Sequence, residues 1–210
     1  MKKIQNIRTD YNLYKMTKDN LQYSPIEQFK LWFSQLEYCN DFNSTTLSTY
    51  SKKNGVQSRI VLLKEIKKDG FVFYTNYNSL KAQQISQNNN VSLCFFWPQF
   101  QRQVRVQGLA FKLSERISKS YFKQRPKQSQ VAAWVSDQSS VVVNRKKLEK
   151  KFSEMYNKFQ FSDVPKPKFW GGYKVKPFSI EFWQGRPDRM HDRFLYQKKG
   201  YKWTVNRLCP

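Results

Sequence analysis

The stretch Ile180–Arg193 reads I-E-F-W-Q-G-R-P-D-R-M-H-D-R and contains His191, the one histidine of the chain. Arg189 and Arg193 stand two positions before and after that histidine, behind an aromatic pair and a turn with glycine and proline. Alternate side chains of an extended segment point to the same side, which predicts that Arg189, His191 and Arg193 line one surface. Such a surface suits an anionic, ring-shaped ligand, and a solvated basic edge is the alternative.

The length and composition predict one folded domain behind a polar arm. A chain of 210 residues can bury one core, and 39% hydrophobic and 17% aromatic residues argue against disorder. Residues 1–23 are polar and basic without periodicity, which predicts a flexible arm that orders only against something else. Residues 24–210 are then the single domain.

The cysteines and the apolar runs predict a cytoplasmic protein. The three cysteines are scattered and form no C-x-x-C pair, which argues against a disulfide framework or a zinc site. The N-terminus lacks the apolar core of a secretory signal, and the apolar runs are too short to span a bilayer. The net charge of +23 attracts phosphate-rich partners, among which nucleic acid has to be considered.

The first predicted element is a helix that begins at Ser24. We expect Ser24 to cap it, with Pro25 in the first turn and Glu27 closing a capping box. Apolar residues at helical spacing then form a face that packs against a core. These residues are Ile26, Phe29, Trp32, Phe33 and Leu36.

From Thr45 on, the pattern is that of short strands joined by tight turns. Strands are predicted over 45–51, 58–65, 71–75, 91–97, 103–108 and within 178–207, and helices over 79–87, 118–123 and 144–159. Asn54-Gly55 and Asp69-Gly70 are the predicted hairpin turns. The run Ile60–Leu63 does not alternate, which predicts a strand covered on both faces. The fold class is mainly β, a small antiparallel barrel with flanking α-helices.

The reactive residues exclude several classes of site. A single histidine without a G-x-S-x-G motif leaves no nucleophilic triad, and no Walker loop or G-x-G-x-x-G motif is present. What remains is a set of clusters suited to phosphate. They are Arg59 with Lys64, Tyr74-Thr75 with Ser79 and Lys81, Tyr121 with Arg125 and Ser129, and Gln138-Ser139-Ser140.

Each cluster taken alone is also compatible with an ordinary structural role, but together they predict two phosphate sites that flank a flat ring system. If the helix at Tyr121 continues far enough, the fourfold spacing of Tyr121, Arg125 and Ser129 places all three on one face. A phenol, a guanidinium and a hydroxyl then meet one anion.

In these residues the chain resembles the pyridoxine (pyridoxamine) 5′-phosphate oxidases, FMN enzymes that make pyridoxal 5′-phosphate. The resemblance runs in register from about Arg8 to Pro210. The matching stretches are R-I-V-L-L-K (59–64), F-V-F-Y-T-N (71–76), R-Q-V-R-V-Q-G (102–108), Y-F-K-Q-R-P-K-Q-S-Q (121–130), A-W-V-S-D-Q-S-S (133–140), F-W-G-G-Y (169–173) and 180–193.

The resemblance implies an FMN-binding split β-barrel homodimer with FMN at the subunit interface. It also implies a role in vitamin B6 salvage, oxidising pyridoxine or pyridoxamine 5′-phosphate with molecular oxygen and releasing hydrogen peroxide. By matching position, the FMN-binding residues would be Arg59, Ile60, Lys64, Tyr74, Thr75, Lys81, Gln103, Gln138, Ser139, Trp183 and Arg193. The substrate-binding residues would be Arg8, Tyr11, Lys64, Tyr121, Arg125, Ser129, Arg189 and His191. Arg189 and His191 would be the catalytic pair over the pyridine ring, and Arg8 and Tyr11 would close the arm over the substrate.

One departure from the family pattern bears on cofactor affinity. The chain has Ser79-Leu80-Lys81 where the family usually has Ser-Arg-Lys. Losing a phosphate contact of that kind costs on the order of 1.5–3 kcal/mol, or roughly tenfold to a hundredfold in FMN affinity. Two alternatives to the oxidase follow. One is a pyridoxal-phosphate-binding protein with weak or lost oxidase activity, favoured by Leu80, and the other is a nucleic-acid-binding protein, favoured by the charge and by Arg145-Lys146-Lys147.

Overall fold

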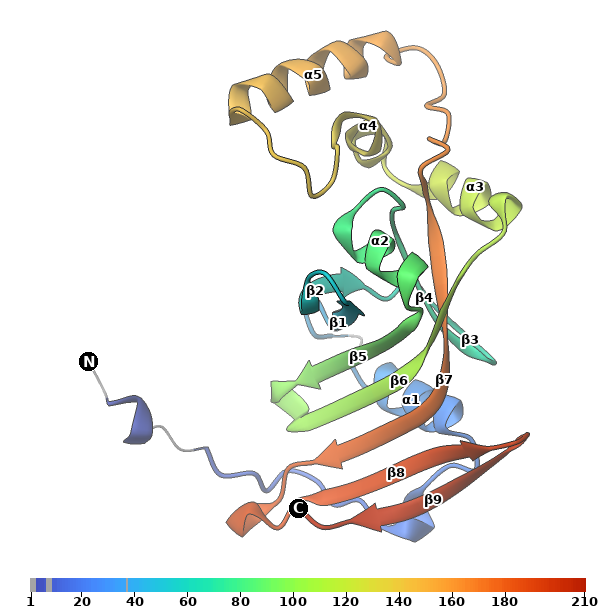
Figure 1. Cartoon of the computed structure of the whole chain (residues 1–210). Helices are drawn as coiled ribbons and strands as arrows, with labels where there is room; N and C mark the ends of the chain where they lie inside the picture. Colours follow the sequence, from blue (N-terminus) through green and yellow to red (C-terminus); the bar gives the residue numbers. More distant parts are fainter. Residues whose placement is uncertain (1–2, 7–8, 37) are drawn as a thin grey trace.

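Strand β7 (Trp170–Gln184) crosses most of the height of the molecule in the computed structural model, which describes residues 3–6, 9–36 and 38–210 (Figure 1). One edge of β7 pairs with β6 (Arg102–Lys112). On the other edge, the first half of β7 pairs with β4 (Gly70–Asn76) and the second half with β8 (Asp192–Lys199). Strand β7 therefore connects two parts of the sheet.

The strand pairs are all antiparallel, in the order β2-β1-β5-β6-β7-β4-β3, with β8 and β9 added at the far end of β7. The remaining strands are β1 (Ser44–Ser51), β2 (Gly55–Leu62), β3 (Glu65–Lys67), β5 (Asn90–Trp97) and β9 (Lys202–Leu208). The prediction of a mainly β fold with flanking helices is confirmed.

The helices gather at two places on the sheet. Helix α1 (Pro25–Ser34) packs against the barrel near β5 and β6, and α2 (Leu80–Gln87) lies beside β1. Helices α3 (Glu115–Gln124), α4 (Lys127–Val135) and α5 (Arg145–Lys158) lie at the end where β7 begins (Figure 1). Short 3₁₀ turns are η1 (Ile4–Asn6), η2 (Lys18–Asn20), η3 (Pro98–Phe100) and η4 (Pro187–Arg189).

The main core forms where α1 meets the barrel. Phe29 of α1 is fully buried, and its ring meets Phe71 and Phe95 edge-on at centroid distances of 4.8 and 4.9 Å. Burial of one such ring stabilises the fold by about 1.5–3 kcal/mol. A second, smaller core around Phe122 and Trp170 lies between the three helices and β7. It fixes α3 and α4 on the start of β7.

Ser24 caps the start of α1 as predicted, but the predicted capping box does not form. Ser24 Oγ accepts a hydrogen bond from the backbone N–H of Ile26 at 3.3 Å. Glu27 does not reach back to the cap, because its carboxylate accepts a hydrogen bond from Lys30 Nζ at 2.8 Å. The favourable i,i+3 ion pair competes with the box.

The prediction that Ile60–Leu63 is covered on both faces is wrong for the single chain. Strand β2 is an edge of the sheet, with Val61 and Leu63 turned inward and buried. Ile60 is 63% exposed and Leu62 42% exposed, so the strand alternates in burial but not in polarity. An apolar outer face on an edge strand indicates a surface that another element or chain covers.

Two predicted strand boundaries are shifted. The strand expected over 58–65 is β2, which begins already at Gly55, where a positive φ of 63° closes the hairpin. The final strand-rich segment begins at Trp170 rather than Phe178. Pro177 lies inside this strand. The structure places that proline at a bulge opposite Gly108, where its missing N–H does not interrupt the ladder.

Candidate functional site

A cavity of about 290 Å³ lies at the end of β4, between β2, α2, α3, the start of β7 and the loop after α4. Thirteen residues line it, from five elements and the loops between them. The side chains that line it include Ile60, Lys64, Tyr74, Thr75, Asn76, Lys81, Tyr121, Arg125, Ser136, Gln138 and Trp170. We call this the β4 site. It brings together most of the residues predicted to bind phosphate groups.

Lys81 is the buried cation of the β4 site. Its Nζ lies 3.3 Å from Thr75 Oγ1, 3.3 Å from Ser79 Oγ and 3.2 Å from Gln138 Oε1. All three acceptors are neutral, so these contacts leave the ammonium charge available to an anion. Burial, together with the nearby charge of Arg59, lowers the pKa of Lys81 to about 8. A phosphate would reverse that shift.

Arg59 is held beside Lys81 by neutral oxygen atoms as well. Its Nη1 donates to Thr49 Oγ1 at 2.6 Å and to the backbone carbonyl of Gln57 at 3.0 Å. Its Nη2 donates to Gln84 Oε1 at 3.4 Å, and burial lowers the pKa of the guanidinium. Two neighbouring cations with neutral partners are suited to an anion, and we call this pair the candidate anion site.

The loop before α5 covers this anion site. Leu80 begins α2, and its backbone N–H donates to Ser139 Oγ at 3.2 Å. Thr75 Oγ1 donates to Gln138 Oε1 at 3.2 Å. These contacts place the hydroxyl of Ser139 and the amide of Gln138 beside Lys81 at the N-terminus of α2, where the helix dipole favours a phosphate group.

An aromatic stack forms the second wall of the β4 site. Tyr74 stacks on Tyr121 at 3.9 Å between centroids and on Trp170 at 5.3 Å. The Arg125 guanidinium lies 4.6 Å from the centre of the Trp170 ring. Its Nη1 atom is buried and has no hydrogen-bond partner in the described part of the chain. That donor is available to a bound oxyanion.

The predicted single helical face of Tyr121, Arg125 and Ser129 is wrong. Helix α3 ends at Gln124, and Arg125 has an extended backbone with ψ at 148°. Pro126 causes this break, because proline disfavours a helical conformation in the preceding residue. The structure nevertheless places Tyr121 and Arg125 in the cavity, while Ser129 is half-buried in α4 outside the residues that line it.

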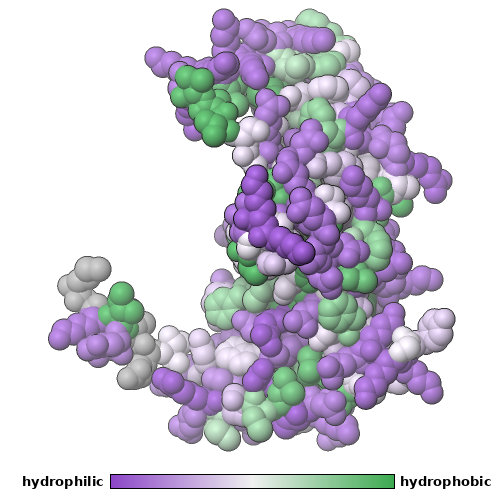
Figure 2. All heavy atoms as spheres, in the orientation of Figure 1, coloured by the Kyte–Doolittle hydropathy of each residue, from purple (hydrophilic) through white to green (hydrophobic). Residues whose placement is uncertain are grey.

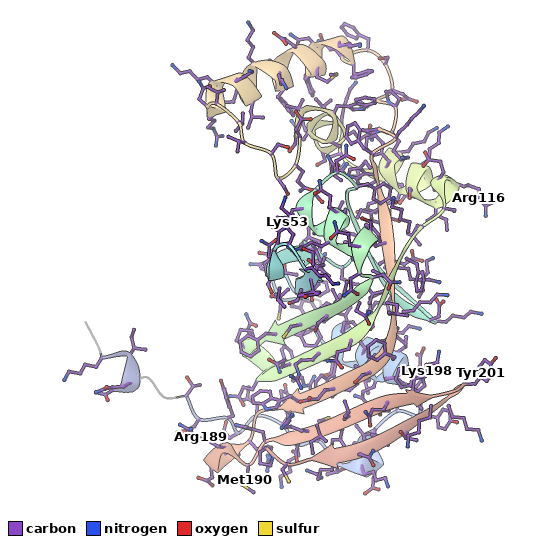
Figure 3. The ribbon with its side chains drawn as sticks, viewed as in Figure 1. Lys53, Arg116, Arg189, Met190, Lys198 and Tyr201 are labelled. Carbon is purple, nitrogen blue, oxygen red and sulfur yellow. The ribbon has the colours of Figure 1, made fainter. Side chains whose placement is uncertain are left out.

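A second cavity, of about 460 Å³, lies between the β7–β8 turn and the N-terminal arm. His191 packs on Trp183 at 4.7 Å between ring centroids, and Tyr11 of the arm meets both rings at 5.7 and 5.9 Å. The cavity is also lined by Asp10, Arg186 and Arg189. We call this the turn site. Figure 3 shows Arg189 on the β7–β8 turn next to the arm.

The imidazole of His191 has a fixed orientation. Its Nδ1 accepts a hydrogen bond from the backbone N–H of Arg186 at 3.1 Å. In the neutral ring the proton is therefore on Nε2, which remains a donor. Burial and the charge of Arg189 lower the pKa of His191, so the neutral form dominates at neutral pH.

The prediction that Arg189, His191 and Arg193 share one extended face is wrong. Asp188 and Arg189 have positive φ angles of 56° and 61°, which fold this stretch into a turn. Arg193 lies in β8, where its Nε donates to Glu181 Oε1 at 2.9 Å and its Nη1 to the backbone carbonyl of Cys209 at 2.6 Å. Arg189 and His191 remain together in the turn site.

The other predicted FMN residues near the turn site follow the sheet register. Gln103 is paired with Trp183 across β6 and β7, and Trp183 with Arg193 across β7 and β8. These three residues thus form a row across three strands. Arg8, predicted to bind the substrate, lies outside the described residues.

The β4 site and the turn site are far apart within one chain. Trp170 lines the first site and Trp183 belongs to the second, at opposite ends of β7. A strand of that length spans roughly 40 Å. Figure 3 likewise shows Arg189 at the other end of the molecule from α3, which carries Arg116.

The sequence analysis missed several residues that shape these sites. Trp170 was noted only as part of a matching stretch, although its aromatic ring supports Tyr74 and Arg125. Gln84 and Thr49, which hold Arg59, carry no local signal, because their contacts join distant parts of the chain. Within the described ranges, no cluster of His, Cys, Asp and Glu could hold a metal ion, and no helix is long and apolar enough to cross a membrane.

Comparisons with known proteins identify the family to which the chain belongs. The family described as "Pyridoxamine 5'-phosphate oxidase" matches residues 35–159, and the "Pyridoxine 5'-phosphate oxidase C-terminal dimerisation region" matches residues 170–210. The second match contains the whole β7–β8–β9 unit and most of the turn site.

Curated relatives match over nearly their whole lengths. A pyridoxine/pyridoxamine 5′-phosphate oxidase of Crocosphaera subtropica is 47% identical, covering 97% of this chain and 98% of the relative. Proteins of the same name from Shewanella sediminis and Hahella chejuensis are 48% and 46% identical. These alignments cover 100% and 99% of this chain and all of each relative.

Solved structures share the fold at lower sequence identity. PhzG from Burkholderia lata 383, in complex with tetrahydrophenazine-1-carboxylic acid, superposes with a TM-score of 0.90 at 23% identity, covering 96% of this chain and 100% of that one. A pyridoxamine 5′-phosphate oxidase-related, FMN-binding protein from Nostoc punctiforme has a TM-score of 0.72 at 14% identity, covering 90% and 100%. The fold is that of the split β-barrels, and the chain belongs to the pyridoxine/pyridoxamine 5′-phosphate oxidase family.

Proposed function

We propose that this protein is an FMN-dependent oxidase that converts pyridoxine 5′-phosphate or pyridoxamine 5′-phosphate into pyridoxal 5′-phosphate. Molecular oxygen accepts the electrons and leaves as hydrogen peroxide, and the amine substrate also releases ammonia. The reaction belongs to vitamin B6 salvage, which we place in the cytoplasm. Full-length relatives of that name support the reaction. The structural observation that carries it is the pair of cations with neutral partners in the β4 site.

The β4 site fits the phosphate end of FMN. Lys81 and Arg59 would hold the phosphate charge, while Thr75 and Ser139 would add hydroxyl contacts beside the N-terminus of α2. The remaining proposed FMN residues are Ile60, Lys64, Tyr74, Gln103, Gln138, Trp183 and Arg193. When bound, FMN supplies the hydride-accepting chemistry, and the protein supplies orientation and exclusion of water.

The substrate phosphate fits the other wall of the same cavity. The free Nη1 of Arg125 and the phenol of Tyr121 lie on that wall with Lys64. Burial raises the pKa of Tyr121, so its hydroxyl stays a hydrogen-bond donor. Ser129 is included in this group by its position in the family motif.

The turn site fits the pyridine ring of the substrate. Arg189 and His191 would lie over the ring opposite the flavin, with His191 donating from Nε2. Tyr11 already packs against Trp183 and His191 and would close this side, with Arg8. Both catalytic residues then act by holding the ring and its charge in place, with the oxidised carbon toward the flavin.

We infer that one complete site needs two copies of the chain, with FMN at their interface. One small molecule cannot contact both ends of β7, so the β4 site of one copy would meet the turn site of the other. Exposed apolar side chains beside the β4 site support this arrangement: Val56, Ile60 and Leu62 on β2, and Val141 and Val143 before α5. Figure 2 shows the molecule hollowed on this side, with hydrophobic surface at its upper rim. The dimerisation region at 170–210 carries the turn site.

One structural feature favours the alternative of a pyridoxal-phosphate-binding protein with weak oxidase activity. Leu80 stands at the start of α2, next to Lys81, where the family usually adds an arginine. A protein with weakened FMN affinity would bind pyridoxal phosphate and oxidise slowly. The basic helix α5 gives less support to nucleic-acid binding, because Arg145, Lys150 and Lys151 form ion pairs with Glu149, Glu154 and Asp137.

The visible absorption spectrum of the purified protein tests the proposal. We expect a yellow flavoprotein whose flavin absorption bleaches when pyridoxine 5′-phosphate is added without oxygen and returns when air is admitted. The Arg189→Ala variant should keep the flavin and lose most of the bleaching rate. A colourless protein that takes up no FMN would contradict the proposal, and unchanged turnover in Arg189→Ala would refute the role of that residue.

A further inference from the structure

Arg102 is a buried arginine outside both proposed binding sites. It opens strand β6 and is 6% exposed, and burial lowers the pKa of its guanidinium to about 10. Its hydrogen bonds go to two amide oxygens, those of Gln184 at 2.9 Å and Gln35. A buried charge with neutral partners is costly, which indicates a specific role for the side chain.

The guanidinium of Arg102 lies among three aromatic rings. Its Cζ is 4.5 Å from the Trp32 ring centre, 4.7 Å from that of Tyr14 and 5.6 Å from that of Phe100. Trp32 and Phe100 belong to the folded domain, whereas Tyr14 belongs to the N-terminal arm and stacks on Phe100 at 5.9 Å. We call Trp32, Phe100 and Arg102 the arm dock. Cation–π contacts of a desolvated arginine are at the strong end of their range.

Backbone hydrogen bonds reinforce the position of the arm around the dock. The Leu13 N–H donates to Gln101 Oε1 at 3.2 Å, and Gln101 Nε2 donates back to the carbonyl of Asp10 at 3.2 Å. Arg186 Nη1 donates to the carbonyl of Tyr14 at 3.2 Å. The arm segment 10–14 is thus held on both sides of Tyr11.

The turn that carries Gln101 is itself fixed through Arg102. Gln184 accepts from Arg102 Nε, and its own amide donates to the carbonyls of Phe100 and Gln101 at 3.1 and 3.2 Å. The backbone N–H of Gly185, the residue after Gln184, donates to the Gln101 carbonyl at 2.8 Å. One connected network therefore joins Arg102 to Gly185, whose backbone lies directly against Tyr11.

We propose that Arg102 is a positioning residue of the oxidase, which docks Tyr14 and thereby places Tyr11 over the turn site. This inference rests on the proposed function, because the turn site is taken to hold the substrate ring. Arg102 does not touch the substrate. It acts through the arm, on substrate binding more than on the oxidation step.

Removing the Tyr14 ring tests the dock without disturbing the core, because Tyr14 lies on the arm and is partly exposed. In Tyr14→Ala we expect KM for pyridoxine 5′-phosphate to rise about tenfold, from the loss of one cation–π and one stacking contact, while kcat changes less than KM. Tyr14→Phe keeps the ring and should restore the wild-type KM. Tyr23→Ala removes a tyrosine from the same arm that is 87% exposed, against 41% for Tyr14, and serves as the control.

Hydrogen–deuterium exchange gives a second measurement that needs no activity. We expect the amides of residues 10–16 to exchange faster in Tyr14→Ala, while those of β6 and β7 stay protected. Arg102→Lys, provided that its melting temperature stays near that of wild type, should show the same exchange, because an ammonium cannot stack between two rings. If the wild-type protein lacks oxidase activity, the exchange result still tests the dock.

Two results would overturn the inference. Wild-type exchange of residues 10–16 in Tyr14→Ala would show that the ring does not hold the arm. Faster exchange with an unchanged KM would show that the docked arm does not position anything needed for substrate binding.

Discussion

Trp170 and Trp183 stand at opposite ends of strand β7, one in the β4 site and the other in the turn site. One continuous strand thus supplies both sites and keeps them roughly 40 Å apart. Because the strand pairs with β6 and with β4 or β8 along its length, this separation is rigid. A ligand that needs both sets of residues has to lie between two copies of the chain.

The pKa of Lys81 predicts a pH dependence of FMN binding. In the free protein, burial and the charge of Arg59 lower this pKa to about 8, so Lys81 loses its proton as the pH rises through that value. The protonated form binds phosphate, so FMN affinity is highest below pH 8 and falls by up to about tenfold per pH unit above it. Fluorescence titration of the apoprotein with FMN across this range measures the effect.

Lys81→Arg is the matched control for that titration, because a guanidinium keeps its charge throughout the range. A profile that falls equally in Lys81→Arg and wild type would assign the pH dependence to another group.

Restoring the arginine that the family usually carries should tighten FMN binding. Leu80→Arg adds a cation at the N-terminus of α2, and we expect the dissociation constant of FMN to fall about tenfold, or about 1.4 kcal/mol. Ser86→Arg adds the same charge to the exposed side of α2 and should leave the affinity within about twofold. Equal effects of the two substitutions would indicate a general effect of charge.

Gly185 gives Tyr11 its place in the turn site. A Cβ atom on Gly185 would lie 2.7 Å from Cγ of Tyr11, closer than such atoms approach, and Tyr11 would have to move away. We therefore expect Gly185→Ala to raise KM for the phosphorylated substrate by about tenfold with little loss of thermal stability. Steady-state kinetics and a melting curve check the two parts.

The double substitution tests the cause of that effect. In a Tyr11→Gly background, Gly185→Ala meets neither the ring nor the Cβ atom of residue 11 and should change KM by less than about twofold. Additive effects would place the action of Gly185 elsewhere.

Local signals predicted much of the fold. Ser24 caps α1, and Asn54-Gly55 and Asp69-Gly70 form the hairpins, because each depends on a few adjacent residues. The prediction that Ile60–Leu63 is covered on both faces was wrong for a reason that lies outside the single chain. Apolar residues on both faces predict cover on both faces, and a single chain covers only one of them.

For the candidate sites, the sequence predicted which residues lie together better than it predicted how they are arranged. The family resemblance brought Lys81, Thr75 and Gln138 together, and the structure confirms that they are in contact. The prediction of one extended face through Arg189 was wrong because Asp188 and Arg189 have positive φ angles. Such angles are rare in non-glycine residues, and an alternating sequence pattern does not reveal them. The break at Arg125 was visible in the sequence, since Pro126 follows it.

Contacts between distant segments could not be predicted from local patterns. Arg102 and Tyr14 are far apart in sequence, and although Arg102 opens the matching stretch 102–108, nothing in that stretch indicates a contact with Tyr14. The contact between them forms only because the fold places the N-terminal arm next to the start of β6. The same holds for Gln84 and Arg59.

The central claim is that each oxidase site combines the β4 site of one chain with the turn site of another. Arg125→Ala damages only the β4 site and Arg189→Ala only the turn site, so each variant alone should be nearly inactive as a homodimer. When equal amounts of the two are unfolded and refolded together, half of the dimers are mixed and each mixed dimer has one intact site of two. We predict recovery of about a quarter of the wild-type activity. A mixture no more active than the two variants measured separately would contradict the account.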